Sequence, residues 1–412
     1  MVRTVPPIAI VADDFTGAND TCGRLAALGW KPYASVSDSV PRGRASALAL
    51  NARTRFLKRE AAFRASRAAW RALLGSGFRP SQRFQKIDST LRGFPSAEIA
   101  GMLDASRGAW AITVPAYPEL GRTTRGGRHY VHGVPLDRSE YSRDPLSPSE
   151  SGRVDRLFPA RQSGHLGLAV VSKGEARLAS AVLELRSRRP DCRFLTFDAA
   201  TEAHLRCIAR AGLRCGCSHW AGASGLAAAL AWSLGGRTAP RPLPRLRKAL
   251  VLAGSISQTT LDQCLALSAS PRSRWVPASK TGAAPAWTAG LRALAVSSVR
   301  RRREADAFRR LCADRGLDAR QAAERAMLAL ARLGDRLAPR DGLVLLTGGH
   351  TAEAFFRLRG YAGTWVEGEL LRGIPYGRAA GPGLGPQWVA TKPGGFGRPD
   401  SLARALRRVL GH

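Results

Sequence analysis

Long apolar runs are missing from this 412-residue sequence, and cysteine is sparse. No stretch approaches the 18 apolar residues that a membrane-spanning helix needs, so we expect none. The apolar run at residues 8–12 is too short for the core of a signal peptide and ends in two aspartates. The seven cysteines are odd in number and widely spaced along the chain, which does not indicate a disulfide framework. We therefore expect a cytoplasmic protein with reduced thiols.

Lysine is also scarce: seven of the 64 cationic residues are lysine and the other 57 are arginine. The net charge of +33 would ordinarily indicate binding to nucleic acid or to an anionic membrane. However, the arginines are scattered, and their one dense run, at residues 300–303, is followed at once by Glu304 and Asp306. A GC-rich coding sequence explains such arginine usage more simply. We predict no nucleic-acid or membrane partner, and a basic nucleic-acid-binding protein stays as an alternative.

The remaining composition is that of a globular protein, with 44% hydrophobic and 23% charged residues over a length that suits two domains. Short apolar runs alternate with segments whose apolar residues lie three and four apart, which predicts βαβ units and largely parallel sheets. The predicted strands are residues 8–12, 47–51, 83–87, 111–115, 168–171, 194–197, 249–253, 275–277 and 343–347, and the predicted helices include 58–74, 173–188 and 318–337, the last with Asp318 as its N-cap.

A proline-rich segment divides the chain. Pro240, Pro242 and Pro244 fall within five residues, which excludes both a helix and a central strand there. We predict a first α/β domain at residues 1–235, a linker at 236–247 and a second α/β domain at 248–412. A possible homo-oligomer is left open.

Polar side chains follow several predicted strands of the first domain. Asp13 and Asp14 end the first strand, and ligands of open α/β sheets bind outside the carboxyl ends of strands. Capping aspartates of an ordinary turn are the alternative. Arg53 follows the next strand, and the segment 85–93 crowds further polar groups that suit a carboxylate ligand: Lys86, Asp88, Ser89, Thr90 and Arg92.

Residues 114–136 are rich in glycine, proline and basic residues and are predicted to form a long loop. Its Arg122, Arg125 and Arg128 could bind phosphate or carboxylate, or could simply be solvated. In the second domain, glycine and hydroxyl side chains follow the predicted strands, which suits a nucleotide because backbone N–H groups can approach phosphates there. Plain turns and caps are the alternative, and no Walker A motif occurs. The candidates drawn from these segments include Ser255, Ser257, Gly348, Gly349 and Gly395.

The ordered motifs ADDFTGAND, KIDSTLRG, PAYPELGRT, AGSISQTT, TGGHTA, IPYG and TKPGGFG resemble those of the four-carbon acid sugar (tetronate) kinases, over about residues 8–400. The resemblance implies an N-terminal substrate domain and a C-terminal nucleotide-binding domain. It implies an ATP-dependent kinase, working with Mg²⁺, that phosphorylates a hydroxyl, expected to be the terminal one, of a threonate, erythronate or 3-oxo-tetronate. By the same likeness, the residues facing the acid are Asp13, Asp14, Arg53, Lys86, Asp88 and Ser89. Those facing ATP are Ser255, Gly348, Gly349, His350, Thr351 and Gly395.

Two positions depart from the family: His350 stands where an acidic residue is common, and Ile256 where cysteine is frequent. Asp14 is the expected base or orienting group for the hydroxyl, with Asp13 and Asp88 as competitors, while Arg53 and Lys86 would hold the carboxylate. The two domains would have to close about the linker to join acid and ATP. A non-catalytic sugar-acid-binding protein is a further alternative. The stereoisomer and the carbon phosphorylated stay undetermined.

A group of possible metal ligands lies outside these motifs, at His204, Cys207, Cys215, Cys217 and His219. Its spacing does not match the paired cysteines of structural zinc sites. We therefore predict cysteines of the hydrophobic core here and no protein-bound metal site.

Overall fold

The computed structural model describes residues 5–36, 45–144, 147–238, 241–278, 286–381 and 384–411. These residues form two compact units. The first contains residues 5–32 and 45–238, and the second contains residues 33–36 together with the described residues from 241 onward. The expectation of two α/β domains with largely parallel sheets is confirmed.

The first unit is built on a parallel sheet in the order β3-β1-β4-β11-β5-β10-β9. The strands are β1 (Ile8–Ala12), β3 (Ala47–Asn51), β4 (Gln82–Lys86), β5 (Ala111–Val114), β9 (Ser163–Leu166), β10 (Phe194–Phe197) and β11 (His219–Gly222). Every residue of β1 and β3 is buried. Burial on both faces explains why these strands are continuous apolar runs without alternation.

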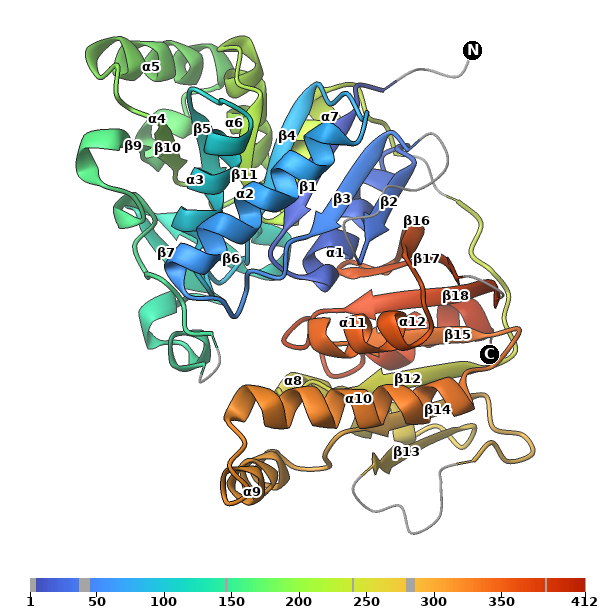
Figure 1. Cartoon of the computed structure of the whole chain (residues 1–412). Coiled ribbons are helices and arrows are strands. Elements are labelled where there is room, and N and C mark those ends of the chain that lie inside the picture. Colours follow the sequence, from blue (N-terminus) through green and yellow to red (C-terminus); the bar gives the residue numbers. More distant parts are fainter. Residues whose placement is uncertain are drawn as a thin grey trace. The chain divides into compact units, whose positions relative to one another are not determined.

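Helices cover both faces of this sheet (Figure 1). They are α1 (Phe15–Ala26), α2 (Arg59–Gly75), α3 (Pro95–Ala105), α4 (Leu168–Val171), α5 (Glu175–Arg188), α6 (Glu202–Arg214) and α7 (Ser224–Ser233). Helix α2 packs against α3, and α1 packs against α7. The chain leaves β1 toward β3 and then returns past β1 to β4, so right-handed crossovers put α1 and α2 on opposite faces. The end of β1 is therefore a switch point of the sheet, where ligands bind.

Two sequence predictions for this unit are wrong. Residues 168–171 form the single-turn helix α4, because β9 already occupies the sheet edge beside β10 and a four-residue apolar run has no period that distinguishes strand from helix. The predicted loop at 114–136 contains an antiparallel sheet of β6 (Arg122–Arg125), β7 (Arg128–Val131) and β8 (Val134–Pro135). Gly126 and Gly127 both have positive φ, 57° and 71°, as a two-residue hairpin turn requires.

The second unit has a mixed sheet in the order β13-β14-β12-β15-β18-β17-β16, with β2 beside β16. The strands are β2 (Pro32–Ser35), β12 (Ala249–Ala253), β13 (Ser273–Pro277), β14 (Ala293–Ser297), β15 (Leu343–Thr347), β16 (Gly363–Leu371), β17 (Ile374–Gly381) and β18 (Leu384–Lys392). Strands β13, β14, β12, β15 and β18 are parallel, whereas β16, β17 and β18 pair antiparallel. The antiparallel strands were not predicted, nor was the contribution of β2 to this unit.

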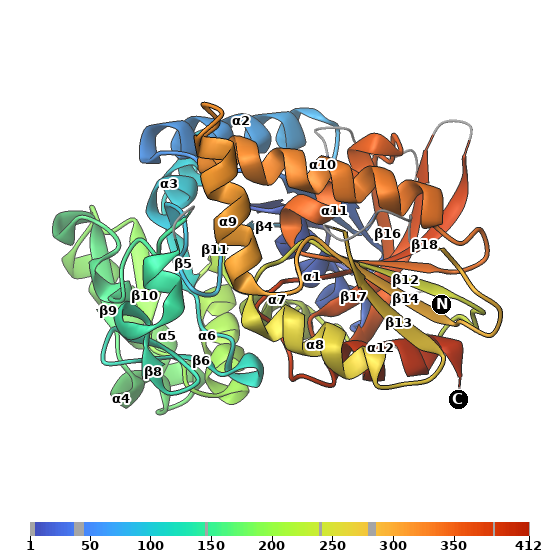
Figure 2. The same cartoon turned by 90° about the horizontal axis from the view of Figure 1, so that it is seen from below.

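Helices α8 (Gln258–Ser268) and α12 (Ser401–Leu410) lie on one side of this second sheet, and α10 (Ala319–Leu337) and α11 (Gly349–Leu358) lie on the other (Figure 2). Helix α9 (Arg302–Ala313) packs against α10. Asp318 caps α10 as predicted, accepting a hydrogen bond from the backbone N–H of Gln321.

Two further sequence predictions concern the linker between the domains and the absence of a membrane-spanning helix. The described residues of the predicted linker, 236–238 and 241–247, form no helix or strand, while Ala239 and Pro240 lie outside the described residues. Among the helices of the described chain, none is both long and apolar enough to cross a bilayer.

Candidate functional site

The first candidate site lies where three neighbouring parallel strands end. In the ladder, Ala12 at the end of β1 pairs with Asn51 of β3 on one side and with Lys86 of β4 on the other. Asp13 and Asp14 follow β1 directly. The parallel register therefore brings the polar groups predicted from three separate segments to one edge of the sheet.

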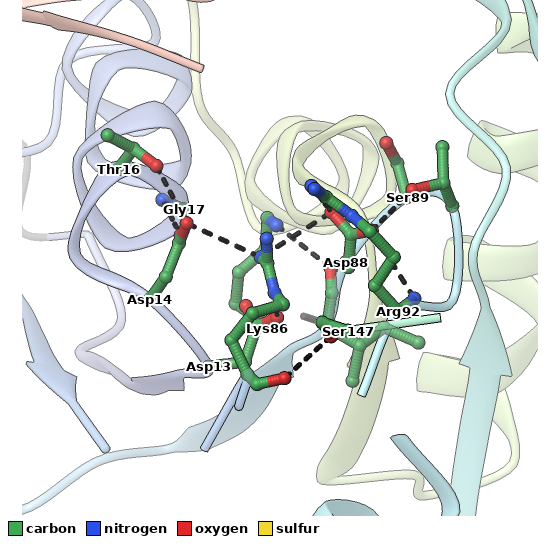
Figure 3. Close-up of polar contacts among 12 residues, drawn as sticks. Asp13, Asp14, Thr16, Gly17, Lys86, Asp88, Ser89, Arg92 and Ser147 are labelled. Atoms are coloured by element: carbon green, nitrogen blue, oxygen red, sulfur yellow. Dashed lines mark hydrogen bonds and ion pairs between the residues drawn. The ribbon is translucent and has the colours of Figure 1, made fainter. Parts of the chain in front are cut away.

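Asp14 forms the N-cap of α1. Its Oδ1 accepts a 2.6 Å hydrogen bond from the backbone N–H of Gly17, and its Oδ2 accepts a 2.9 Å bond from the Thr16 hydroxyl (Figure 3). A Cβ on Gly17 would lie 2.8 Å from Asp14 Oδ1 and 3.2 Å from Lys86 Nζ. A glycine is needed here because both side chains approach the backbone closely. The Lys86 ammonium is also close enough to Asp14 for its charge to act on that carboxylate.

Arg55 connects the carboxylates of this site. Its Nε donates to Asp13 Oδ2, and its Nη2 lies 3.5 Å from Asp14 Oδ2 and 3.4 Å from Asp88 Oδ1. The guanidinium is buried. Arg53, which was predicted from its place after the strand, has an exposed side chain and a positive φ of 56°. The structure thus brings Arg55, which sequence reasoning missed, into the cluster.

Asp88 is held by the turn that follows β4. Arg92 binds it through both Nε, at 2.8 Å from Oδ2, and Nη2, at 3.2 Å from Oδ1 (Figure 3). The Thr90 hydroxyl also donates to Asp88 Oδ2. The Lys86 ammonium donates to the carbonyl oxygen of Ile87 at 2.8 Å. The polar residues of the second motif are therefore largely bound to one another, which fixes their geometry before any ligand arrives.

The surrounding charges lower the pKa of two of these carboxyl groups. Burial opposes the ionisation of Asp88, but the charges of Arg55 and Arg92 outweigh it and hold the Asp88 pKa well below its usual range. Burial likewise opposes the ionisation of Asp14, and the charges of Arg55 and Lys86 outweigh it, so the Asp14 pKa is also lowered. Both side chains are carboxylates at neutral pH.

Two other buried carboxyl groups have raised pKa values. Burial raises the pKa of Asp13, and the Arg55 charge offsets this only in part. Burial and the nearby Asp13 charge raise the pKa of Glu98, on α3, well above its usual range. Thr54 Oγ1 lies close enough to influence this pKa, yet among the described residues neither Glu98 oxygen forms a hydrogen bond of normal geometry. Burial therefore favours the uncharged form of the Glu98 carboxyl group, a feature that the sequence did not indicate.

Two buried polar atoms of the cluster have no partner within the described part of the chain: Asp13 Oδ1 and Ser89 Oγ. Buried polar atoms are nearly always hydrogen-bonded, so unpaired ones at a strand end suit a polar ligand or water. His129 of β7 stabilises the Ser89 backbone, because its Nε2 lies 2.8 Å from the Ser89 carbonyl oxygen while its Nδ1 lies 2.9 Å from Thr124 Oγ1. Burial lowers the His129 pKa to about 4, so the ring is neutral and its Nε2–H donates.

The second candidate site lies in the other unit, at the ends of β12, β15 and β18. The Ser257 hydroxyl donates to the Gly394 carbonyl oxygen at 2.9 Å, and Ser255 Oγ lies 3.1 Å from Ser257 Oγ. Gly348 donates its N–H to the Lys392 carbonyl oxygen at 2.9 Å and has a φ of 99°, which disfavours any side chain. Three glycine- and serine-rich segments predicted from the sequence are therefore joined at one sheet edge.

The remaining predicted residues of this unit occupy the same edge. Gly349 and His350 begin α11 and are half-buried, and Gly395 lies in the turn after β18. Thr351 is buried, and its hydroxyl donates to Met327 Sδ at 3.2 Å. Thr351 therefore faces the interior, whereas the glycines lie nearer the surface.

The cysteines and histidines considered for zinc bind backbone carbonyls or hydroxyl groups. Cys207 donates to Val171, Cys215 to Ala179 and Cys217 to its neighbour His219, all through backbone oxygens. All seven cysteines lie in the described residues and are free thiols. In the part of the chain that the structure describes, no three His, Cys, Asp or Glu side chains are grouped as metal ligands.

Comparison with known proteins identifies both units. Residues 8–230 match the sugar-binding N-terminal domain family, and residues 250–402 match the nucleotide-binding C-terminal domain family. The chain is 30% identical to D-threonate kinase of Bordetella bronchiseptica, with 98% of each chain covered. It is 32% identical to D-threonate kinase of Cupriavidus necator, with 97% of each covered, and 30% identical to 3-oxo-tetronate kinase of Methylobacterium radiotolerans, with 97% of this chain and 98% of the relative covered.

Two solved structures show the same fold. A Salmonella typhimurium LT2 protein solved as a putative tRNA synthase superposes with a TM-score of 0.79 at 23% identity, covering 98% of this chain and 99% of that one. A Haemophilus influenzae protein superposes with a TM-score of 0.69, also at 23% identity, covering 96% and 98%.

A sugar-binding domain followed by a nucleotide-binding domain, in a chain whose full-length relatives are kinases, defines a two-domain carbohydrate kinase. The chain belongs to the four-carbon acid sugar kinase family. The predicted family and enzyme class are thereby confirmed.

Proposed function

We propose that this kinase transfers the γ-phosphoryl group of ATP to a hydroxyl, the terminal one, of a four-carbon sugar acid such as threonate, erythronate or 3-oxo-tetronate. The observation that carries the proposal is the group of Asp13, Asp14 and Asp88 around Arg55 at the switch point of the sugar-binding unit. The names of the relatives support the substrate class. In this proposal a domain at residues 1–235 binds the acid and a domain at residues 248–412 binds ATP. Residues 236–247 link the two domains.

The solvent exposure of the three carboxylates indicates which of them orients the reacting hydroxyl. The Asp14 side chain is 17% exposed, against 1% for Asp13 and 8% for Asp88, so Asp14 is the one that a substrate reaches most easily. The acid's hydroxyl oxygen attacks the γ-phosphorus, its proton passes to the Asp14 carboxylate, and ADP leaves. Asp13 competes for this role because its Oδ1 has no partner among the described residues and its raised pKa favours accepting a proton.

The acid's own carboxylate needs cations. Arg55 is already shared among three carboxylates, so it serves chiefly to hold them in place. Lys86 and the exposed Arg53 are the cations that we assign to the acid, with Arg92 and the hydroxyls of Ser89 and Thr90 as further contacts.

The glycine-rich edge of the second unit receives the ATP phosphates, through Ser255, Ser257, Gly348, Gly349, His350 and Gly395, while the buried Thr351 supports this edge from the interior. The donors here are hydroxyls and amides, and the described residues offer no cluster of three carboxylates or other ligands. These groups suit a Mg²⁺ ion that is bound mainly by the ATP phosphates and has few ligands from the protein. When bound, the ion would neutralise phosphate charge.

The test is an ADP-release assay with purified protein, Mg²⁺, ATP and each stereoisomer of threonate and erythronate, together with the 3-oxo acids. We expect ADP release only when one of these acids is present, and a phosphorylated product of matching mass. Calorimetric binding of an acid without turnover would instead support a non-catalytic sugar-acid-binding protein. No turnover with any of the acids, by protein that melts cooperatively, would refute the kinase proposal.

A further inference from the structure

Lys392, the last residue of β18, is fully buried in the second unit. Its ammonium donates hydrogen bonds to three backbone carbonyls of the turn that follows: Pro393 at 2.8 Å, Gly394 at 3.1 Å and Phe396 at 2.9 Å. Within the described part of the chain it forms no ion pair with a carboxylate. Burial without a counter-charge lowers the pKa of Lys392 to about 7, so an anion held close by would favour its charged ammonium form.

The geometry of the peptide unit shows what this arrangement does to the turn. The described chain has no cis peptide bond, and in a planar trans peptide the C=O and the N–H of the next residue point in opposite directions. The carbonyls of Pro393 and Gly394 point inward to Lys392. The N–H groups of Gly394 and Gly395 therefore point away from the buried ammonium, toward the half-buried surface of the turn.

Other side chains reinforce the same orientation. The hydroxyls of Ser257 and Thr260 both donate to the Gly394 carbonyl oxygen, at 2.9 and 2.8 Å. Gln263 donates to the Phe396 carbonyl oxygen at 2.9 Å. A Cβ on Gly394 would lie 2.1 Å from Ser255 Oγ, so the backbone and the serine loop are in close contact. Hydrogen bonds from the interior thus hold the turn at each of these carbonyl oxygens, and its backbone N–H groups face outward.

We propose that Lys392 is a positioning residue for nucleotide phosphate: its buried ammonium turns the amides of Gly394 and Gly395 outward as an anion-binding nest and places a positive charge behind them. Successive N–H groups that point to one side form such a nest. The ammonium acts through the backbone without contacting the phosphate, unlike the lysine of a Walker A loop, which reaches the phosphates directly. This inference rests on the proposed use of ATP and adds the group that shapes its phosphate site.

The experiment compares ADP with adenosine, because the two share a base and ribose but only ADP carries phosphates. We would measure both dissociation constants by calorimetry for the wild-type chain and for Lys392→Met, which removes the donor and the charge at similar volume. Lys392→Gln serves as a second variant because it keeps a hydrogen-bond donor and is expected to fold if the methionine variant does not. Lys248→Met, an exposed lysine of the same unit, is the matched control.

We expect Lys392→Met to weaken ADP binding about tenfold or more, because the turn is no longer held with its amides toward the phosphates and the charge behind them is removed, while adenosine binding changes little. Lys392→Gln should fall between this variant and the wild type, and Lys248→Met should match the wild type. An unchanged ratio of ADP to adenosine affinity in folded Lys392 variants would overturn the proposal, as would an equal loss for both ligands. A wild-type chain that binds ADP no better than adenosine would overturn it too. If ADP binding follows the expectation but no acid is phosphorylated, the kinase proposal alone fails.

Discussion

Arg55 donates its Nε–H to the carboxylate of Asp13, and both side chains are almost completely buried. The same guanidinium lies within 3.5 Å of oxygens of Asp14 and Asp88. One cation therefore offsets the repulsion among three carboxylates that the parallel sheet brings together. This arrangement makes Arg55 more important for the integrity of the site than for direct contact with a substrate.

Replacing Arg55 by Met should lower the free energy of unfolding by about 3–5 kcal/mol, because it leaves buried carboxylates without their counter-charge. Urea unfolding measures this loss. Arg53→Met, two residues earlier and on an exposed side chain, is the matched control and should change stability by no more than about 0.5 kcal/mol. Equal effects of the two substitutions would show that Arg55 does not hold the cluster together.

Glu98 gives a prediction about how stability depends on pH. Its folded pKa is raised above the usual 4.5, so above that pH the unfolded chain loses the proton that the folded chain keeps. Stability contributed at this residue therefore falls as pH rises, by up to about 1.4 kcal/mol per pH unit until the folded pKa is reached. Glu98→Gln mimics the uncharged acid and should gain stability relative to the wild type as pH rises above the usual 4.5 toward the folded pKa.

Urea unfolding at several pH values tests this, with the exposed Glu60→Gln on α2 as the control for removing a surface carboxylate. A Glu98→Gln difference that stays constant with pH would mean that Glu98 is ionised in the folded protein.

The role of Asp14 can be separated from that of Asp13 by asparagine substitutions. Asparagine still caps a helix, so Asp14→Asn should keep the bond from the Gly17 N–H and fold normally. We expect its kcat to fall about 10²–10⁴-fold, the usual contribution of a general base, with little change in the KM for ATP. Asp13→Asn should instead lose thermal stability, because it disrupts the buried pair with Arg55.

Steady-state ADP release and thermal melts distinguish the two variants. The exposed, salt-bridged Asp104→Asn on α3 is a control for removing a carboxylate far from the strand ends. If Asp14→Asn keeps its kcat while folded Asp13→Asn loses it, Asp13 is the base.

The sequence predicted the members of the first site that directly follow an apolar run. Asp13, Asp14 and Lys86 come at strand ends, and the ends of parallel strands must meet at one edge of a sheet. Arg55 could not be found in this way, because it follows β3 by four residues and the direction of its side chain depends on the turn at Arg53. A positive φ at an arginine is uncommon and has no sequence signature.

The strands of the fold likewise divide into those that the sequence predicted and those that it missed. Buried parallel strands such as β1 and β15 were predicted because they are uninterrupted apolar runs between helical segments. The antiparallel strands β16 to β18 were missed because glycine stands at buried positions such as Gly368 and Gly377, where an apolar side chain would have marked the alternation. The hairpin of β6 and β7 did carry a usable signal, the Gly126-Gly127 pair, which was attributed to a loop instead.

The last prediction separates the ligands of the two units. The Lys86 ammonium is close enough to act on Asp14 in the sugar-binding unit, and Gly349 begins α11 in the nucleotide-binding unit. Lys86→Met should weaken binding of the sugar acid by about 1.5–3 kcal/mol, the scale of a charge-assisted hydrogen bond, and should leave ATP binding nearly unchanged. Gly349→Val places a branched side chain where the backbone should approach a phosphate, so it should weaken ATP binding and spare the acid.

Calorimetric titration of each ligand into each variant measures both effects, after a thermal melt has established that the variant is folded. Lys31→Met provides the control for removing a lysine of the sugar-binding unit, because Lys31 is exposed and precedes β2. Because each substitution disturbs the binding of one ligand only, the two variants should show opposite patterns. Loss of ATP binding by Lys86→Met with the acid still bound would mean that the ligands have been assigned to the wrong units.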